Sequence, residues 1–499
     1  LEPELMESVD VAVVGAGLAG LTTARQLIRA GRSVVVLEGN DRVGGRTASE
    51  RLGQATFDIG GQWIGPQQRR MTHLAAELGA ATFPTFDMGR KVLDVDGHIS
   101  TYTGAIPSLP PAALVIMQTA IWRIDRMAAR IPAEDPWQAP DAARLDARTL
   151  ASWMSSAIPS KTVRGAMTAA VRVIFGAEPS ELSLLHALWY IGQGGGILKL
   201  VEIRDAAQES RFVHSAHSVS VALADELGDQ VRLSSPVTCI AQNADGVVIT
   251  TGGRGVADGQ VRARRVVVTA PPHMAARIRY QPGLPAQRDA LLQRIPMGGT
   301  IKFHALYDAA FWREAGFSGE MVCTSGPVSV IFDNCSHDGA QAALVGFCVG
   351  AAAREVGRLP EAEQQRVFEE VLVRGFGPRA RRHTLLRIKD WAADEWSRGC
   401  PTGIMPPGVM GIYGPALREP CGRIHWAGTE TAREWTGYME GAVESGERVA
   451  REVDAALRSD SVGQTVRSAV PRHHPAQFGA DLTADLTPDE TTWLDADLG

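Results

Sequence analysis

The sequence predicts a mixed α/β fold, because apolar runs of strand length alternate with segments of helical spacing. The clearest example is near the N-terminus, where residues 9–14 form a mostly β-branched run that ends in glycines. Apolar residues at helical spacing follow as far as Gly31, which is placed to end a helix, and a second apolar run covers 34–37. Strands that are apolar on both faces are typical of a parallel sheet covered by helices. We therefore expect strand, helix and strand in succession here.

The composition is that of a globular protein. The chain has 499 residues, of which 45% are apolar and 21% charged, and its formal net charge is -6. At roughly 100 to 200 residues per domain, this length predicts two to four domains. The chain has no block of lysines and arginines, which disfavours a nucleic-acid or membrane partner, since either needs a concentrated positive surface. A small phosphate-bearing ligand needs only one local site and is not excluded.

Cysteine usage predicts a reducing compartment. The six cysteines are scattered, with no CxxC pair and no histidine spacing that completes a zinc site, so no metal is expected. His214 and His217 have a spacing that can hold a metal, but no third ligand is apparent nearby. No run approaches about twenty apolar residues, and residues 1–10 lack the apolar core of a signal peptide. We expect a cytoplasmic protein.

The first glycines form a GxGxxG motif of Gly15, Gly17 and Gly20, and Glu38 ends the second strand. Gly15 allows a tight turn, Gly17 lets the backbone approach a pyrophosphate, and Gly20 permits close packing of helix and strand. The helix N-terminus faces the phosphates, while Glu38 accepts hydrogen bonds from the ribose. This order of elements predicts a Rossmann-like dinucleotide-binding unit. It does not distinguish NAD from FAD.

Two further glycine-rich segments follow at 42–46 and 58–66. They resemble the flavin-binding signature of the flavin-containing amine oxidases, and this resemblance implies FAD as the cofactor. Paired glycines bring backbone amides against a phosphate or a ring, and Arg46 can pair with the pyrophosphate as a fixed cation. The residues expected at the cofactor here are Gly44, Gly45, Arg46, Gly60, Gly61, Gln62 and Trp63.

The far end of the chain carries a matching pattern. Residues 424–427 form an apolar strand, and an amphipathic helix is expected over 439–457. The run 425–453 closely resembles the C-terminal flavin motif of the monoamine oxidases. The helix N-terminus would then point at the pyrimidine oxygens of the flavin. The cofactor residues implied by this motif and by matching family positions are Gly428, Thr429, Glu430, Gly437, Met439, Val237 and Trp391.

The resemblance covers about residues 9 to 457 and implies a Rossmann-like FAD-binding domain of the amine-oxidase type that is discontinuous, with an inserted mixed α/β substrate domain. The expected FAD-binding domain comprises 1–85, 212–290 and 392–458, the substrate domain 86–211 and 291–391, and an acidic C-terminal extension 459–499. The active site is expected between the two domains. A short helix is expected from Thr487, either docked on the body or on a partner subunit, or left as an appendage.

Two residues are expected to act in catalysis. Lys302 matches the lysine that in this family holds a water beside flavin N5, where an ammonium favours negative charge, although a solvated strand lysine is the alternative. Tyr438 matches one wall of the aromatic cage that orients the amine. Phe332 and Phe347 are further pocket candidates, with ordinary core packing as the alternative.

The chain departs from the animal monoamine oxidases at Cys400 and Pro401. Cys400 stands where those enzymes link covalently to the flavin, and Pro401 replaces their second cage tyrosine. The pairing of Pro401 with Tyr438 resembles bacterial amine oxidases of the cyclohexylamine oxidase type, whose FAD is not covalent. A cage opened on one side has room for bulkier cyclic or branched amines. Non-covalent FAD is favoured over a thioether at Cys400.

The function implied by the resemblance is an FAD-dependent oxidase of primary or secondary amines, cyclic, aryl or alkyl. The amine would become an imine that water hydrolyses, and oxygen would become hydrogen peroxide. The alternatives are an L-amino-acid oxidase, which needs a cavity arginine, a polyamine oxidase, which favours a carboxylate, and a flavin-binding interaction protein without turnover. The expected partners are a small-molecule amine and oxygen, with no nucleic acid and no membrane, and a homodimer is a family expectation.

Overall fold

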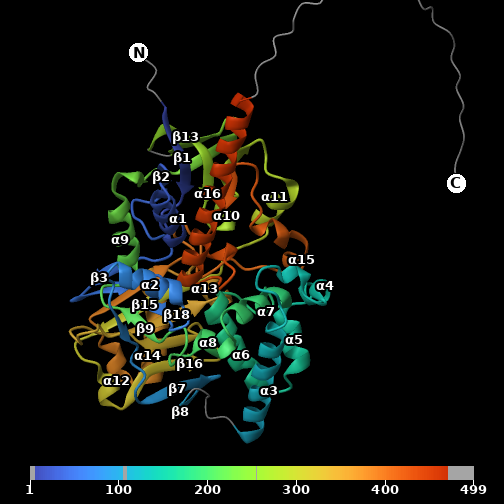
Figure 1. Ribbon diagram of the computed structural model, residues 1–499. Coiled ribbons are helices and arrows are strands. Elements are labelled where there is room, and N and C mark those ends of the chain that lie inside the picture. The colour runs from blue at the N-terminus through green and yellow to red at the C-terminus, as the bar shows by residue number, and fades with distance from the viewer. Residues whose placement is uncertain (1–5, 105–109, 254–255, 470–499) are drawn as a thin grey trace, which may run out of the picture. The chain divides into compact units, whose positions relative to one another are not determined.

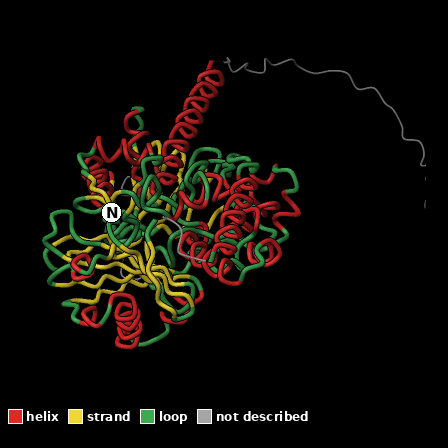
Figure 2. Tube along the Cα trace, turned by 90° about the horizontal axis from the view of Figure 1, so that it is seen from below, coloured by secondary structure: helices red, strands yellow, loops and turns green. Residues whose placement is uncertain are grey.

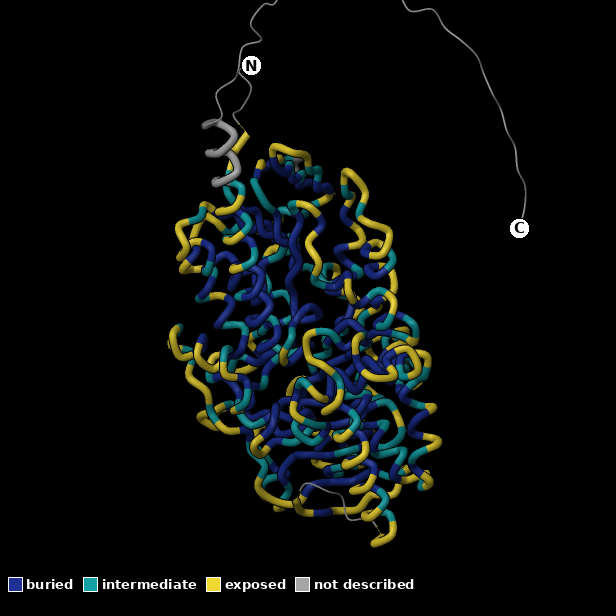
Figure 3. Tube along the Cα trace, turned by 45° about the vertical axis from the view of Figure 1, so that its right-hand side comes forward, coloured by how far each residue is buried: buried dark blue, intermediate teal, exposed yellow. Residues whose placement is uncertain are grey.

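The computed structural model describes residues 6–104, 110–253 and 256–469, and the expected helix from Thr487 lies outside these ranges. Two sheets organise the part that it describes up to Leu457 (Figure 1). The central strands of both sheets, such as 11–14 and 300–307, are buried, and the interior of the molecule is drawn dark blue in Figure 3. The mixed α/β fold class expected from the sequence is thereby confirmed.

An eight-stranded sheet contains the N-terminal motif. Its strand order is β10-β2-β1-β13-β12-β11-β14, and β20 also pairs with β13. The first strand is parallel to both of its neighbours, β2 and β13, and β20 is parallel to the end of β13. Residues 424–426 therefore lie beside 266–268. The strands are β1 (Glu7–Val14), β2 (Val34–Leu37), β10 (Val231–Arg232), β11 (Val237–Gln242), β12 (Val247–Gly253), β13 (Val256–Val268), β14 (Arg279–Gln281) and β20 (Ile424–Trp426).

Helices cover both faces of this sheet, as expected for apolar parallel strands. On one face, α1 (Leu18–Arg29), α9 (His217–Leu227) and the first part of α16 (Met439–Ala469) share one apolar core with β1 and β2. On the other face, α10 (Pro272–Ala275) and α11 (Ala286–Leu292) contribute to a second core. The last helix continues past the expected end at Leu457.

A seven-stranded sheet has the order β19-β15-β18-β17-β16-β7-β8. Helix α14 (Glu361–Phe376) covers one face, where Phe368 stacks on Phe303 with a ring-centre distance of 4.4 Å. Because side chains alternate along a strand, Lys302 points to the opposite face. The strands are β7 (Arg90–Val95), β8 (His98–Tyr102), β15 (Thr300–Tyr307), β16 (Phe317–Cys323), β17 (Val330–Asp333), β18 (Ala342–Val349) and β19 (Leu385–Asp390).

Most of the segment 110–201 is helical, and its helices group apart from the strands (Figure 2). Ser160 and Ser183 cap two of them by accepting a hydrogen bond from a first-turn amide. The helices are α3 (Pro111–Ala128), α4 (Ala142–Asp146), α5 (Leu150–Ala157), α6 (Lys161–Phe175), α7 (Leu184–Gln193) and α8 (Ile197–Val201). Smaller elements complete the fold: α2 (Arg69–Glu77), α12 (Phe311–Glu314), α13 (Ala351–Val356), α15 (Met410–Tyr413), β3 (Ser49–Leu52), β4 (Ala55–Asp58), β5 (Trp63–Ile64), β6 (Thr82–Pro84) and β9 (Ser210–Phe212).

All six cysteines are free thiols. Within the described ranges, every helix is too short or too polar to cross a lipid bilayer.

Candidate functional site

One cavity of about 520 Å³ joins the two sheets. Its lining comes from the N-terminal glycine segments, from the helices of 110–201, from strands of both sheets and from the C-terminal motif. The sequence-predicted residues that line it are Gly15, Gly17, Glu38, Gly44, Gly45, Arg46, Gly60, Gly61, Gln62, Trp63, Val237, Lys302, Phe332, Phe347, Trp391, Cys400, Pro401, Gly428, Thr429, Gly437, Tyr438 and Met439. Gly20 and Glu430 are not in the lining and act from behind it.

The nucleotide end of the cavity is built mainly from backbone. Gly15 has a φ of +102°, and a Cβ on Gly20 would lie 1.9 Å from the Gly15 carbonyl oxygen. Gly20 therefore permits the close helix-strand packing expected of it. A Cβ on Gly17 would meet only the Gly44 carbonyl at 4.0 Å, so the cavity is open there. The Glu38 carboxylate accepts hydrogen bonds from the amides of Ala16 (2.6 Å) and Asn40 (2.9 Å).

An ion pair between the partly buried Arg46 and the buried Glu430 joins the N-terminal and C-terminal motifs at the cavity. The Arg46 guanidinium donates to both carboxylate oxygens of Glu430, at 2.5 and 2.9 Å, and to the Pro401 carbonyl at 2.9 Å. Burial alone would lower the pKa of Arg46, but the Glu430 carboxylate outweighs it, and the net pKa is raised. Glu430 also accepts from the Gly403 amide at 3.1 Å. Arg46 is therefore a fixed cation on the cavity wall.

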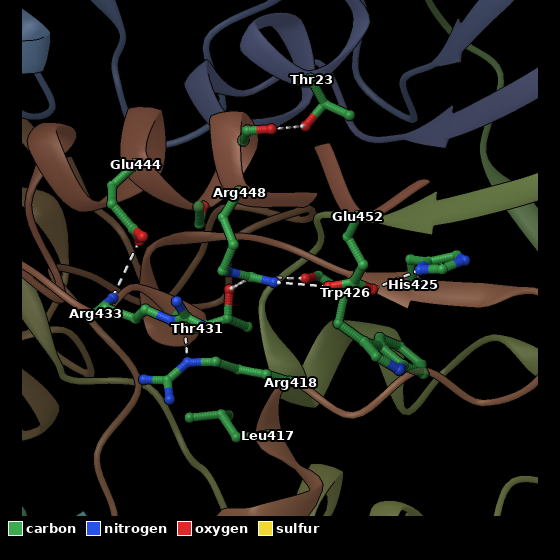
Figure 4. Close-up of polar contacts among 12 residues, drawn as sticks. Thr23, Leu417, Arg418, His425, Trp426, Thr431, Arg433, Glu444, Arg448 and Glu452 are labelled. Carbon is green, nitrogen blue, oxygen red and sulfur yellow. Dashed lines mark hydrogen bonds and ion pairs between the residues drawn. The ribbon is translucent and has the colours of Figure 1, made fainter. Parts of the chain in front are cut away.

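Arginines outside the cavity donate hydrogen bonds to residues on either side of the turn that carries Glu430 (Figure 4). Arg448 on α16 donates to the Trp426 carbonyl and to the Thr431 hydroxyl, both at 2.9 Å. Arg418 donates to the Thr431 carbonyl at 2.7 Å. Because these bonds fix the chain on both sides of residues 428–430, they hold the C-terminal motif against the cavity.

Lys302 is buried, which excludes the alternative of a solvated strand lysine. Its ammonium donates to the carbonyls of Asp58 (2.6 Å) and Gly60 (2.9 Å) and to Gln62 Oε1 (2.5 Å). Burial lowers the pKa of Lys302, and the nearby Asp58 carboxylate opposes that shift. The indole of Trp391 packs beneath Gly60 and donates to the Ile59 carbonyl at 2.9 Å. The ammonium is therefore held by the glycine turn that lines the cavity.

Aromatic rings surround the other end of the cavity. Trp63 lies 5.2 Å from Phe332 and 5.7 Å from Phe347, measured between ring centres. Tyr438 lies 6.1 Å from Tyr190, whose hydroxyl would be 2.2 Å from a Cβ on Gly437. Burial raises the pKa of the Tyr438 phenol, so it is neutral at ordinary pH. We call this group of five rings, Trp63, Tyr190, Phe332, Phe347 and Tyr438, the aromatic end.

Sequence analysis missed several lining residues. Tyr190 lies on α7, and Leu200 and Gln208 lie on or after α8. Gln208 is buried, donates to the Leu200 carbonyl at 2.9 Å, and has an unpartnered Oε1. Trp396 packs against Gly39 at the nucleotide end. These residues lie outside the glycine motifs on which the sequence analysis relied.

Cys400 and the two histidines, His214 and His217, lie in different surroundings. Cys400 lines the cavity, and burial raises its pKa to about 11, so its thiol stays protonated near neutral pH. His217 begins α9, and its ring nitrogens lie 3.1 Å from the Val43 carbonyl and 3.1 Å from the Ser49 hydroxyl. Its ring therefore supports the 42–46 loop. His214 is exposed, and no group of three or more metal-ligating side chains forms in the described ranges.

These features fit a flavin dinucleotide. The open backbone at Gly17 and the acceptor Glu38 suit a pyrophosphate and a ribose, and the fixed cation Arg46 lies further along the same cavity. The cavity then continues past the Gly60 turn and Lys302 to the aromatic end, which leaves room for a ring system and a small substrate. The fold and the site define a dinucleotide-binding oxidoreductase.

Comparison with known proteins agrees with the assignment to the dinucleotide-binding oxidoreductases. Residues 18–454 match the family described as flavin containing amine oxidoreductase, and the chain belongs to this family. It is 38% identical over 446 residues to a probable flavin-containing monoamine oxidase A of Dictyostelium discoideum, covering 89% of this chain and 97% of that protein. It is 36% identical to the amine oxidase [flavin-containing] A of Bos taurus, covering 90% of this chain and 85% of that one. The chain is thus a flavin-containing amine oxidase.

Solved structures are similar in fold. Cyclohexylamine oxidase from Brevibacterium oxydans IH-35A has a TM-score of 0.85 and 35% identity, over 90% of this chain and 99% of that one. Wild-type putrescine oxidase bound to putrescine has a TM-score of 0.86 and 33% identity over the same shares. The family expected from the sequence is confirmed. The two neighbours are named for different kinds of amine: cyclohexylamine has one amino group and putrescine has two.

Proposed function

We propose that this protein oxidises monoamines with a single basic nitrogen and an apolar cyclic, aryl or alkyl body. The observation that carries the proposal is the lining of the aromatic end. The acidic side chains in the described cavity lining are Glu38 and Glu395, and Glu38 is bonded to backbone amides at the nucleotide end. Glu395 adjoins Trp396, which packs on Gly39 there. A diamine needs an anionic partner for its second ammonium, and the aromatic end offers none.

The same lining argues against an amino acid as substrate. A substrate carboxylate needs a cation that is available to it, and Arg46 already forms two hydrogen bonds with Glu430. Lys302 is likewise engaged with three oxygens. What the aromatic end offers an amine is the electron-rich face of its rings and the unpartnered Gln208 Oε1. These groups orient a neutral amine without trapping its protonated form.

We assign the chain's own residues the following roles. Tyr438, with Tyr190 beside it, orients the amine. Pro401 leaves one side of the cage open for bulk. Lys302 holds positive charge beside the reacting ring of the cofactor. Bound FAD supplies the two-electron redox chemistry, by which the amine becomes an imine and oxygen becomes hydrogen peroxide. The imine, once released, is hydrolysed by water to an aldehyde or a ketone.

We propose that segments 1–85, 212–290 and 392–458 form the FAD-binding domain, and that 86–211 and 291–391 form the substrate domain. Support comes from the strands, since the eight-stranded sheet draws its strands from the first set and the seven-stranded sheet from the second. A homodimer and a cytoplasmic location are further proposals, which rest on the family resemblance and on the free cysteines.

We propose that FAD is bound without a covalent link. A thioether forms from a reactive thiolate. With a pKa of about 11, the Cys400 thiol is protonated near neutral pH, and little thiolate is present there. Acid precipitation is therefore expected to leave the yellow flavin in the supernatant. Colour that stays with the pellet, and disappears from it in Cys400→Ser, would establish the link instead.

The decisive experiment is anaerobic mixing of the holoenzyme with single amines. Benzylamine and cyclohexylamine are each expected to bleach the flavin absorption band, which returns when air is admitted. Putrescine and L-leucine, at the same concentration, are expected to bleach it far more slowly. Bleaching by putrescine first would replace the monoamine proposal with a diamine oxidase, and bleaching by leucine with an amino-acid oxidase. A flavin band that no amine bleaches would favour a flavin-binding protein without turnover.

A further inference from the structure

A buried chain of hydrogen bonds leads from Lys302 into the substrate side of the molecule. Gln62, which accepts from the Lys302 ammonium, donates through Nε2 to Asn334 Oδ1 at 3.2 Å. Arg211 donates to the same Asn334 oxygen at 2.7 Å, and through its other terminal nitrogen to the Cys335 carbonyl. All four side chains are buried. Neither Asn334 nor Arg211 lines the cavity.

The donors and acceptors in this chain can be arranged in one way only. Arg211 carries donors and no acceptor, so Asn334 must turn its oxygen toward it. That oxygen also faces Gln62, so Gln62 must present its NH₂ group to Asn334. The remaining carbonyl oxygen of Gln62 then faces Lys302, whose ammonium also offers only donors. Each amide is therefore oriented by the group behind it, beginning at Arg211.

We infer that Arg211 and Asn334 are positioning residues that set Lys302 through the orientation of Gln62. The inference rests on the role proposed above for Lys302. Of the three oxygens on the ammonium, two belong to the backbone near the glycine turn, and only Gln62 Oε1 is free to rotate. Without the Asn334 oxygen, Gln62 can turn its NH₂ toward Lys302, which disfavours the ammonium and releases its side chain.

Other charged and titratable groups also face Lys302. Asp58 lies on β4, Cys400 lies in the loop after β19, and Arg211 on β9 adds a second buried cation. His304 lies on the same strand, and burial lowers its pKa well below the usual value, so it is neutral. Lys389 on β19 lies opposite Lys302 on β15, and its ammonium is 3.0 Å from the Asp394 carboxylate. The test must therefore report on Lys302 itself.

The composition of the chain makes such a measurement possible. Of its 50 basic residues only five are lysines, namely Lys91, Lys161, Lys199, Lys302 and Lys389. Incorporation of lysine labelled with carbon-13 at Cε gives five NMR signals, and Lys302→Met identifies the one of interest. The chemical shift of that signal, followed against pH in the oxidised holoenzyme, reports the protonation of Lys302 without turnover.

Asn334→Leu is expected to lower the pH midpoint of the Lys302 signal by about one unit, which is a tenfold change in proton affinity. It is also expected to slow the reaction of the dithionite-reduced holoenzyme with oxygen, and to leave flavin reduction by saturating amine within about twofold. A midpoint that stays at the wild-type value overturns the inference. Equal slowing of both reactions also overturns it, because that pattern indicates general damage to the site.

Three further variants guard against misfolding. Gln62→Met removes the acceptor at the other end of the chain, leaves Arg211 bonded to Asn334, and is expected to lower the midpoint in the same direction. Asn334→Asp keeps an oxygen for both donors and is expected to hold the midpoint at or above the wild-type value. Trp312→Phe removes a buried hydrogen bond to the neighbouring Asp333 and is expected to change neither readout. A lowered midpoint in Trp312→Phe would overturn the inference.

The proposed role of Lys302 fails separately. If Lys302→Met leaves the reaction of the reduced enzyme with oxygen unchanged, that role is wrong, whatever the NMR midpoints show. If Lys302→Met slows the reaction while Asn334→Leu and Gln62→Met move neither the midpoint nor the rate, the role stands and the inference about Arg211 and Asn334 is overturned.

Discussion

The two ends of the cavity are built in different ways. The nucleotide end is built mainly from backbone within one short N-terminal segment, with Gly15 and Gly17 leaving space and Glu38 held by two amides. The aromatic end uses side chains from separate elements, including Trp63 on β5, Tyr190 on α7 and Phe332 on β17. The nucleotide end can therefore be predicted from a local sequence pattern. The aromatic end forms only when folding brings distant residues together. The variants below test this difference, from the largest expected effect to the smallest.

Arg46→Met is expected to have the largest effect, because it leaves the buried Glu430 carboxylate without its cation and with only the Gly403 amide as a hydrogen-bond donor among the described contacts. Removing one partner of a buried ion pair costs about 3–5 kcal/mol in the free energy of unfolding. Denaturant unfolding of the flavin-loaded protein measures this cost. The control Arg29→Met, whose side chain is 48% exposed, is expected to stay within about 0.5 kcal/mol of the wild type. Similar losses in both variants would show that the Arg46 pair does not hold the ends together.

Gly20→Ala and Gly17→Ala are expected to separate folding from binding. The added Cβ at Gly20 meets the Gly15 carbonyl at 1.9 Å, so overpacking should destabilise the fold by about 1–3 kcal/mol. The Cβ at Gly17 has room in the protein but projects into the nucleotide end, so Gly17→Ala should fold normally and lose flavin affinity. Melting temperature and bound flavin per chain distinguish the two. A stable, fully loaded Gly17→Ala protein would refute the cofactor position.

Tyr438→Leu keeps apolar volume but removes the ring face at the aromatic end. An aromatic pair between Tyr438 and the substrate ring is worth about 0.5–1.5 kcal/mol beyond its buried area, so kcat/KM should fall roughly 2- to 12-fold while bound flavin is unchanged. Steady-state kinetics with benzylamine measures this. Tyr413→Leu, on α15 and outside the cavity lining, is the matched control and should keep full activity. An unchanged kcat/KM in Tyr438→Leu would remove the ring from substrate binding.

His186, which packs beside the aromatic end, should make the free energy of unfolding fall in acid. Its ring packs near Phe175 and Tyr190, both ring nitrogens are unpartnered, and burial lowers its pKa to about 3. The unfolded chain binds a proton near pH 6.5 and the folded one does not, so stability falls between about pH 6.5 and pH 3. This residue contributes a slope of about 1.4 kcal/mol per pH unit. His186→Phe should flatten the decline of unfolding free energy between pH 7 and pH 5, and an unaltered decline would contradict this.

Several residues that sequence reasoning proposed for the nucleotide end line the cavity, although Trp396 there was missed. Gly15, Gly17, Glu38 and the 42–46 segment could be assigned because each task falls on residues close together in the chain. The C-terminal motif was assigned by resemblance, and the structure shows what it does: Glu430 lies behind the cavity and fixes Arg46. That contact spans most of the chain, and no local pattern predicts it.

The aromatic end could be predicted only in part, because its residues also come from distant parts of the chain. Phe332 and Phe347 could not be told from core aromatics, because alternation along a strand shows which residues share a face and not what that face meets. Tyr190 sits within the apolar helix 184–193, where helical periodicity favours core packing. The partners of Lys302 come from β4 and from the turn that follows it, and only the paired sheets bring them together.

The pairing of β20 with β13 and the Arg46–Glu430 contact also bear on when the site can be complete during synthesis. The glycine motif leaves the ribosome first, but the strand and the carboxylate that complete its surroundings are translated more than 380 residues later. While the intervening residues are made, the nascent chain therefore carries a nucleotide-binding signature without a finished pocket. We therefore expect the flavin site to be complete only after residue 430 has been made, and chains that stop before residue 424 to bind no flavin.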